Sequence, residues 1–247
     1  MIKFEIKDGV AIIPEGTTEI GEDTFYDCAS LESVIIPESV VKIGDDAFGG
    51  CTSLKSITLP ESITSIGWYA FNGCTSLKNV TLPDSVTFLG ENAFKGCTSL
   101  ESITISKSVT RIDHYVFDDC SSLKSIIIPE SVKDIGVGTF RWCTALESIT
   151  LPESVTRIEQ NAFKGCASLK NIAIPGSVRE IEEYAFEGCT SLTTVILPVG
   201  VKEINLTAFY KCPSLSIIYV PAEKTDYYKE LLPEKLHGKI VELAPEK

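Results

Sequence analysis

The sequence predicts a solenoid, a stack of short coils built mostly from short parallel β-strands and turns. Three residue types recur every 23 positions without insertion or deletion, which is the signature of a repeat architecture. Phenylalanine sets the period at Phe25, Phe48, Phe71, Phe94, Phe117, Phe140, Phe163, Phe186 and Phe209. Cysteine follows three residues later in each unit and so accounts for all nine cysteines, and proline fills nine of ten equivalent places, with Ser106 at the tenth. A unit this short cannot bury its own apolar face, so neighbouring units must stack.

Each unit predicts two short extended segments and a turn. In residues 94–116, Ile103 and Ile105 alternate with Thr104, which suits a short strand whose isoleucines point inward. The proline that normally follows cannot donate to a strand ladder and ends the strand. Residues 109–112 form a second extended piece, and the turn carries the phenylalanine and the cysteine. We therefore expect a parallel sheet along one side of the solenoid.

The repeated pattern L-x-x-I-x-I-P-x-S-V-x-x-I-G-x-x-A-F-x-G-C-x-S resembles the leucine-rich repeat of the bacterial BspA-like surface-antigen family over residues 10–221. The resemblance implies a leucine-rich-repeat solenoid of the α/β horseshoe type, with short parallel strands on one side and turns and short helical turns on the other. It also implies a curved surface for protein recognition and adhesion, often on a secreted protein. Serine stands where many leucine-rich repeats carry asparagine, and we expect each hydroxyl to bond a neighbouring backbone group, at Ser39, Ser62, Ser85, Ser108, Ser131, Ser154 and Ser177.

Both ends depart from the repeat and are interpreted as caps. Residues 1–13 predict a hairpin, because Asp8-Gly9 is a turn signal. Apolar residues alternate before that turn, at Ile2, Phe4 and Ile6. Residues 222–247 predict a C-terminal cap with a helix that Pro233 ends. With the repeats at 14–221 they are interpreted as a single domain, 1–247.

Charge and motif content exclude several function classes. The 22 Lys and Arg residues against 34 Asp and Glu give a net charge of −12, which disfavours nucleic acid and membrane surfaces as partners. A membrane span is not expected, because no apolar run has the length that one needs. The first residues lack the features of a secretory signal. The resemblance implies an extracellular or cell-surface location, and a cytoplasmic location stays open.

Metal, cofactor and catalytic chemistry are not expected. Cysteines 23 residues apart lack the close ligand pairs of zinc sites, and stacked strands hold equivalent residues too far apart for a disulfide. We predict nine free, buried thiols. The two histidines, His114 and His237, have no supporting catalytic motif, and His114 is interpreted as a solvated turn residue. The chain is therefore predicted to be non-enzymatic.

Two groups of residues are candidate protein-binding sites. On the turn side, Trp142 stands where five equivalent places hold glycine, so Arg141 and Trp142 are the favoured hot spot. The alternative is that Trp142 only covers the neighbouring turn. Other aromatic residues share this side, at Trp68, Tyr69 and Tyr115. Near the C-terminus an apolar patch is expected, to be covered by the cap helix or by a partner or second copy, at Ile196, Val199, Ile217 and Tyr219.

The outward face of the sheet is interpreted as a solvated surface. Its central row is rich in threonine and is interrupted by Ile35, Ile127 and Ala173. The function favoured overall is a protein-binding or adhesion module for an extracellular-matrix or host cell-surface protein. The alternative is a structural spacer or scaffold, natural or designed, with no ligand of its own.

Overall fold

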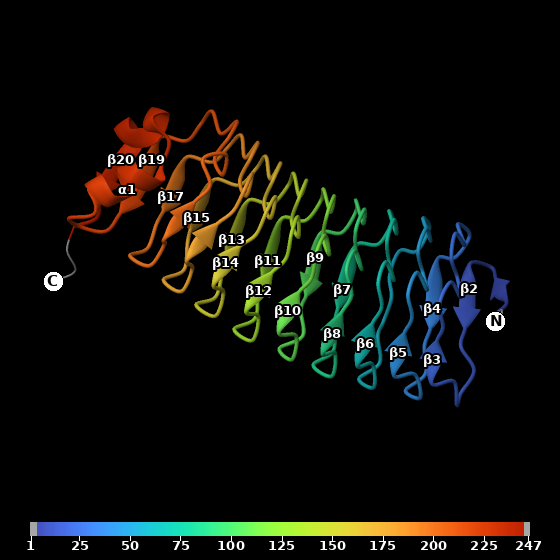
Figure 1. Ribbon diagram of the computed structural model, residues 1–247. Coiled ribbons are helices and arrows are strands. Elements are labelled where there is room, and N and C mark those ends of the chain that lie inside the picture. Colours follow the sequence, from blue (N-terminus) through green and yellow to red (C-terminus); the bar gives the residue numbers. More distant parts are fainter. Residues whose placement is uncertain (1–3, 245–247) are drawn as a thin grey trace.

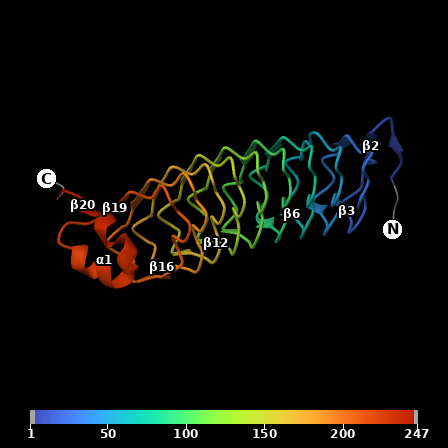
Figure 2. The same cartoon turned by 90° about the horizontal axis from the view of Figure 1, so that it is seen from above.

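The computed structural model describes residues 4–244, and the chain winds there into a stack of coils (Figure 1). Seen from above, the coils follow one another from the N-terminal hairpin to the C-terminal helix (Figure 2). Neighbouring coils pair in parallel, and the predicted solenoid of short parallel strands is confirmed. Among the described residues, helical structure is confined to α1 (Thr225–Leu231) and η1 (Glu234–Lys239), both after the last coil. The other side of each coil is therefore made of turns without the expected helical turns.

Two rows of strands run along the stack. The first row consists of β2 (Val10–Ile12), β4 (Ser33–Ile35), β7 (Asn79–Thr81), β9 (Ser102–Thr104), β11 (Ser125–Ile127), β13 (Ser148–Thr150), β15 (Asn171–Ala173), β17 (Thr194–Ile196) and β19 (Ile217–Val220). The second consists of β3 (Glu19–Ile20), β5 (Lys42–Ile43), β6 (Ser65–Ile66), β8 (Phe88–Leu89), β10 (Arg111–Ile112), β12 (Asp134–Ile135), β14 (Arg157–Ile158), β16 (Glu180–Ile181) and β18 (Glu203–Ile204). In β9, Ile103 is buried between two exposed neighbours, as the alternation predicts. The second extended segment is shorter than expected but forms ladders of its own.

The core is a ladder of phenylalanine rings. From Phe25 to Phe209 the rings of neighbouring coils are stacked, with centroids 5.1 to 6.0 Å apart. Each cysteine from Cys51 to Cys212 donates its thiol to the carbonyl oxygen of a phenylalanine in the preceding coil, as Cys97 does to Phe71 at 3.2 Å. All nine cysteines lie within the described residues, none forms a disulfide, and eight are buried, whereas Cys28 is half-buried. The thiol prediction is therefore right about disulfides and wrong about the burial of Cys28.

These buried thiols predict a pH dependence of stability. Burial raises the pKa of Cys97 to about 12 from an ordinary value of 9.0. A thiol whose pKa is raised in the folded state contributes stability that is fully present below pH 9 and is lost as the pH rises toward 12. We expect the free energy of unfolding in urea to decrease over this range, and to decrease less steeply in Cys97→Ala. An equal slope in that variant, or fewer than nine thiols titrated in denaturant without reductant, would contradict this account.

The serine ladder forms as predicted in six coils. Ser39, Ser62, Ser85, Ser131, Ser154 and Ser177 each donate to a carbonyl oxygen of the preceding coil. The coil with Ser106 differs, because the Ser106 hydroxyl donates to the carbonyl oxygen of Val86 at 2.7 Å. By the period of 23, that oxygen is the acceptor that Ser108 would otherwise use. The residue that replaces the proline has therefore taken over the hydrogen bond of this coil.

The coil that contains β10 interrupts the regular stack. The second row of strands divides into two sheets between β8 and β10, and the rings of Phe94 and Phe117 are 6.0 Å apart, the widest spacing from Phe25 to Phe209. In this coil Asp113 replaces the glycine found at Gly90. A Cβ atom added to Gly90 would lie 2.6 Å from the backbone of the preceding coil. Glu159 and Glu182 also carry a Cβ at the equivalent place, and their strands stay paired with the preceding coil, so the Cβ of Asp113 does not by itself explain the interruption.

The ends of the stack are closed differently. At the N-terminus β1 (Ile6–Lys7) pairs with β2 antiparallel across a turn in which Asp8 and Gly9 both have positive φ, and Ile2 lies outside the described residues. At the C-terminus Tyr228 and Leu232 are buried against the last coil, and the Tyr228 hydroxyl donates to the carbonyl oxygen of Pro198. Strand β20 (Ile240–Glu242) then pairs with β19. No helix in residues 4–244 combines the length and the apolar character that crossing a membrane requires.

Candidate binding surfaces

One side of the stack carries an aromatic and charged surface, which we call the turn ridge. It lies on the turns around the phenylalanine ladder and consists of Tyr69, Lys95, Tyr115, Asp118, Arg141, Trp142, Lys164, Tyr184, Glu187, Tyr210 and Lys211. Its backbone conformation is unusual, because φ is positive at Tyr69, Tyr115, Trp142 and Tyr184, between 56° and 60°. Other residues between positions 23 and 211 also have positive φ. Except for Lys211, they are glycine, asparagine or aspartate. Bulky side chains rarely adopt this conformation, so the four aromatic residues are held under strain.

Arg141 is fixed by a buried carboxylate. Its Nε and Nη2 atoms donate to the two carboxylate oxygens of Asp118 at 2.8 and 2.7 Å. The Asp118 side chain is only 2% exposed and also lies 3.6 Å from the Lys95 ammonium. The guanidinium carbon of Arg141 is 5.1 Å from the centre of the Tyr115 ring, within the range of a cation–π contact. Arg141 is therefore held in place before any partner arrives.

Trp142 covers the turn of the next coil and is still 47% exposed. A Cβ atom on Gly165 would lie 2.3 Å from Cε3 of its indole, so the indole lies directly over that glycine. Tyr115 covers Gly138 in the same way, with Cε1 2.4 Å from the corresponding Cβ position. The contact of the indole with the turn at Gly165 is the one that the alternative interpretation expects. The exposed part of the indole remains available to a partner.

A second charged group follows on the ridge. Glu187 pairs with Lys164 at 2.7 Å and with Lys211 at 3.2 Å, and its side chain is 10% exposed. These two ammonium groups hold the pKa of Glu187 below its usual value, so the carboxylate stays ionised at neutral pH. Lys164 also lies over the Tyr184 ring, at 5.2 Å from its centre. The same arrangement therefore occurs twice on the ridge, at Asp118 and at Glu187. In each case a shielded carboxylate pairs with two cations that lie over tyrosine rings.

Trp68 and Tyr69 are exposed but lie apart from this arrangement. Tyr69 occupies the same row as Tyr115, with Asn92 between them. Two coils therefore separate the tyrosines, a distance of about 10 Å at the spacing of neighbouring strands. The structure brings together Tyr115 and Arg141, with Trp142 beside them, and leaves Trp68 and Tyr69 as a separate exposed pair.

The C-terminal apolar patch is partly exposed. Ile196 pairs in register with Tyr219, and Tyr219 with Val241 of β20, so these residues form one row on the outward face. Ile217 and Tyr219 are half-buried, Ile196 is at the margin of exposure, and Val199 is 66% exposed. The helix leaves Ile196 and Val199 exposed, although Tyr227 and Tyr228 donate to the carbonyl oxygens of Val201 and Pro198 on either side of Val199. Strand β20 extends the row of the patch by Val241.

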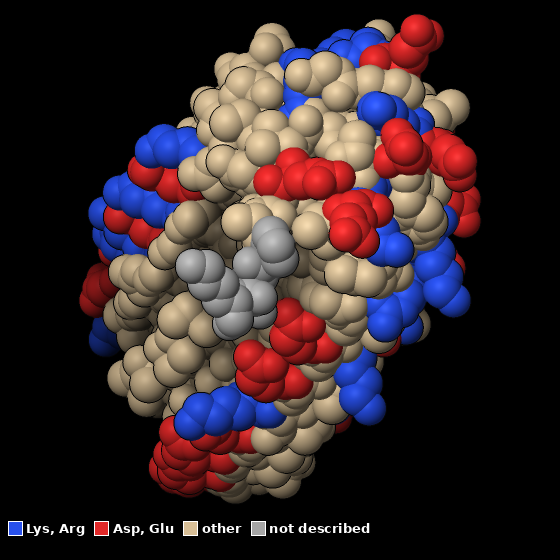
Figure 3. Space-filling view, turned by 90° about the vertical axis from the view of Figure 1, so that its left-hand side faces the viewer, with Lys and Arg blue, Asp and Glu red and all other residues tan. Residues whose placement is uncertain are grey.

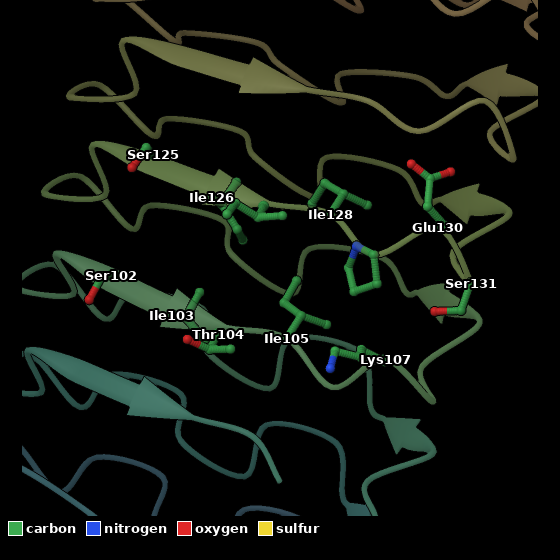
Figure 4. A pocket seen from close by; sticks show the side chains of 12 residues that line it. Ser102, Ile103, Thr104, Ile105, Lys107, Ser125, Ile126, Ile128, Glu130 and Ser131 are labelled. Atoms are coloured by element: carbon green, nitrogen blue, oxygen red, sulfur yellow. The ribbon is translucent and has the colours of Figure 1, made fainter. Parts of the chain in front are cut away.

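A groove on the outward face was missed by the sequence interpretation (Figure 4). It has a volume of about 710 Å³ and lies between the coils of β9 and β11, with Lys107 and Glu130 at one end. Ile127 lines it and is 84% exposed, and β9 and β11 are paired in register only at Thr104 and Ile127. Two signals mark this place in the sequence. One is Ser106 in the proline row, and the other is Ile127 in a row of threonines.

His114 has a structural contact that its interpretation as a solvated turn residue did not include. Its ring is half-buried, and Nδ1 accepts a hydrogen bond from the backbone N–H of Val137 at 2.9 Å. The nearest carboxylate oxygens, on Asp113 and Glu159, are 3.7 and 3.8 Å from its ring nitrogens. Within residues 4–244, no three His, Cys, Asp or Glu side chains converge in a way that could hold a metal ion.

Charge elsewhere on the surface is mixed. A column of lysines and glutamates forms ion pairs between neighbouring coils, as between Lys170 and Glu147 at 3.0 Å. Viewed from the C-terminal end, charged side chains of both signs occupy the flanks, and several acidic side chains lie among the uncharged atoms of the end (Figure 3). Exposed pairs of this kind contribute little to stability. This column, where lysines pair with exposed carboxylates, is called the reference column and serves as a control surface for the turn ridge.

Comparisons with known proteins agree on the architecture. Residues 18–143 and 110–232 match the model described as the BspA type leucine-rich repeat region of six copies. The leucine-rich repeat protein of T. pallidum is similar, at 26% identity, a TM-score of 0.55 and coverage of 93% of this chain and 92% of that one. A leucine-rich cell-surface protein of Faecalibacterium prausnitzii has 26% identity, a TM-score of 0.50 and coverage of 86% and 81%. The pneumococcal vaccine antigen PcpA shares the fold, at 23% identity, a TM-score of 0.50 and coverage of 87% and 68%. No curated protein matches the chain.

Proposed function

Since the chain belongs to the BspA-type leucine-rich-repeat family, we propose that it is a non-enzymatic protein-binding module whose contact surface is the turn ridge. The observation that carries this proposal is the backbone strain at Trp142. At φ 60° the chain holds a half-exposed indole where five other coils have glycine. Strained residues concentrate at functional sites, and exposed tryptophan and arginine are typical interface anchors.

The finer proposal is adhesion at a cell surface. Similarity to the F. prausnitzii cell-surface protein supports an extracellular position, in which a matrix or host surface protein is the partner. The turn ridge suits such a partner, because Arg141 is already ordered by Asp118 and loses little side-chain freedom on binding. Arg141, Trp142 and Tyr115 are proposed as the centre of the interface, with Trp68 and Tyr69 at its edge.

The alternative is a scaffold without a ligand. Near-identical units favour it, because a spacer needs no variation at outward positions. The variation concentrated at Tyr115, Arg141 and Trp142 favours binding instead. The outward-face groove at Ile127 and the patch at Val199 are the competing surfaces for any partner.

The test is binding of the purified chain to a panel of immobilised extracellular-matrix and cell-surface proteins at physiological salt. Trp142→Gly installs the residue that five other coils use, and Ile127→Thr installs the residue of the neighbouring coils. We expect saturable binding that Trp142→Gly weakens at least tenfold, as for a central interface tryptophan, and that Ile127→Thr and Tyr219→Ala leave unchanged. Loss of binding in Ile127→Thr or Tyr219→Ala alone would move the site to the outward face. Absence of binding to every panel member would favour the scaffold.

A further inference from the structure

Two neighbouring cations without a carboxylate between them stand at the centre of the turn ridge. Along one row, successive coils carry Lys95, Asp118, Arg141, Lys164 and Glu187. The signs run positive, negative, positive, positive and negative. We propose that the Arg141–Lys164 pair, with the indole of Trp142 beside it, binds a carboxylate side chain in an acidic peptide segment of the partner. This inference rests on the proposed function and names the chemistry of its partner.

The backbones of the two cationic residues are held side by side by the fold. They belong to consecutive coils, and the backbone N–H of Trp142 donates to the Lys164 carbonyl oxygen at 2.7 Å. Neighbouring strands are about 4.8 Å apart, so two positive charges at equivalent places repel each other. Each cation is paired only on its far side, Arg141 with Asp118 and Lys164 with Glu187. An anion placed between them would relieve this repulsion.

The carboxylates that order these cations cannot serve as that anion. Asp118 and Glu187 are almost fully shielded from solvent, at 2% and 10% exposure of their side chains, whereas the Arg141 and Lys164 side chains are partly exposed. Each carboxylate is also shared with a further cation, Asp118 with Lys95 and Glu187 with Lys211. The group around Glu187 therefore has two cations for one anion, whereas Asp119 also interacts with Arg141 and Lys95 and balances the charge of the group around Asp118. The excess positive charge at Lys164 and Lys211 is a local exception on a chain of net charge −12.

The neighbourhood of Trp142 favours a peptide over a free anion. The half-exposed indole offers an apolar face next to the charged pair, so a segment with an acidic and an apolar side chain contacts both. Arginine suits a carboxylate because its planar donors match the carboxylate oxygens. Phosphate or sulfate would use only the charged part of this surface.

The experiment uses the fluorescence of Trp142 in a Trp68→Phe background, where Trp142 is the single tryptophan of the chain. The probes are a synthetic peptide of alternating glutamate and leucine, its glutamine counterpart, and sodium phosphate and sulfate. We expect a saturable change with the glutamate peptide that weakens as salt is added. No change with this peptide, or an equal change with the glutamine peptide, would overturn the proposal. A response to phosphate and sulfate as strong as that to the peptide would overturn its assignment to a peptide.

Two matched variants distinguish a specific effect of the Arg141–Lys164 pair from the loss of one positive charge anywhere on the surface. Lys164→Gln should weaken binding of the glutamate peptide about fivefold, the upper range for one exposed ion pair. Lys170→Gln changes the charge equally in the reference column and should have no effect. Equal effects of both variants would contradict a specific site. If a panel protein binds with dependence on Trp142 but not on Lys164 or salt, the proposed function stands and this inference fails. If binding is independent of Trp142, the proposed function itself fails.

Discussion

Phe71→Ala is expected to lower the free energy of unfolding by about 4 kcal/mol, the usual cost of removing a fully buried phenylalanine. The ring is completely buried and stacks on Phe48 at 5.2 Å and on Phe94 at 5.1 Å. Both neighbours belong to adjacent coils, so the cavity would open at two interfaces. In a solenoid, stability depends on these nearest-neighbour interfaces.

Chemical denaturation of purified variants measures this effect. Phe88→Ala is the matched control, because Phe88 is an exposed residue of β8 and loses the same atoms. We expect it to change the free energy of unfolding by less than about 1 kcal/mol. Similar losses in both variants would contradict a core built on the phenylalanine ladder.

Gly90→Ala is expected to destabilise the protein by about 3 kcal/mol, although it adds only one methyl group. The new Cβ would lie 2.6 Å from backbone atoms of Gly67 and Trp68, which cannot rotate away as a side chain could. The two coils must then separate, and overpacking of this kind costs about 1 to 3 kcal/mol or more. Strand β8 pairs with β6 at this point, so ladder hydrogen bonds would be strained as well.

The control lies one coil further along. Asp113→Ala keeps a Cβ at the equivalent place, where the stack has already widened. We expect it to change stability by less than about 1 kcal/mol, because only the surface contacts of the carboxylate with Arg111 and His114 are lost. If Gly90→Ala proves as mild as Asp113→Ala, close approach of the coils is not what requires glycine here.

The period of 23 residues is sufficient to predict the stacking of the coils, because every strict repeat position proves to be a core or corner position. Phe94, Cys97 and Ile103 are buried as the pattern requires. Serine hydroxyls bond the preceding coil wherever proline precedes them, and the exception is at Ser106. The second row of strands was expected, but its strands are shorter than predicted, because two residues per coil are too few for an alternation to set their bounds.

Surface features depend on relations between coils that periodicity does not describe. The groove at Ile127 forms where pairing between β9 and β11 is reduced. The pairing of Asp118 with both Lys95 and Arg141 requires side-chain geometry that the row of charged residues alone does not give. Whether the cap helix or a partner covers the C-terminal patch was left open by the sequence for a related reason. The apolar face of the helix, with the buried Tyr228 and Leu232, could pack on more than one surface.

The most direct test of the central claim, that Trp142 is kept for binding, is the free energy of unfolding of Trp142→Gly. A left-handed conformation costs a bulky residue about 1 kcal/mol, and glycine removes this cost while giving up the contact of the indole with Gly165. The account predicts that the variant is as stable as the wild type to within about 0.5 kcal/mol, or more stable. A loss of 2 kcal/mol or more would contradict it, because the indole would then be a structural cover for Gly165.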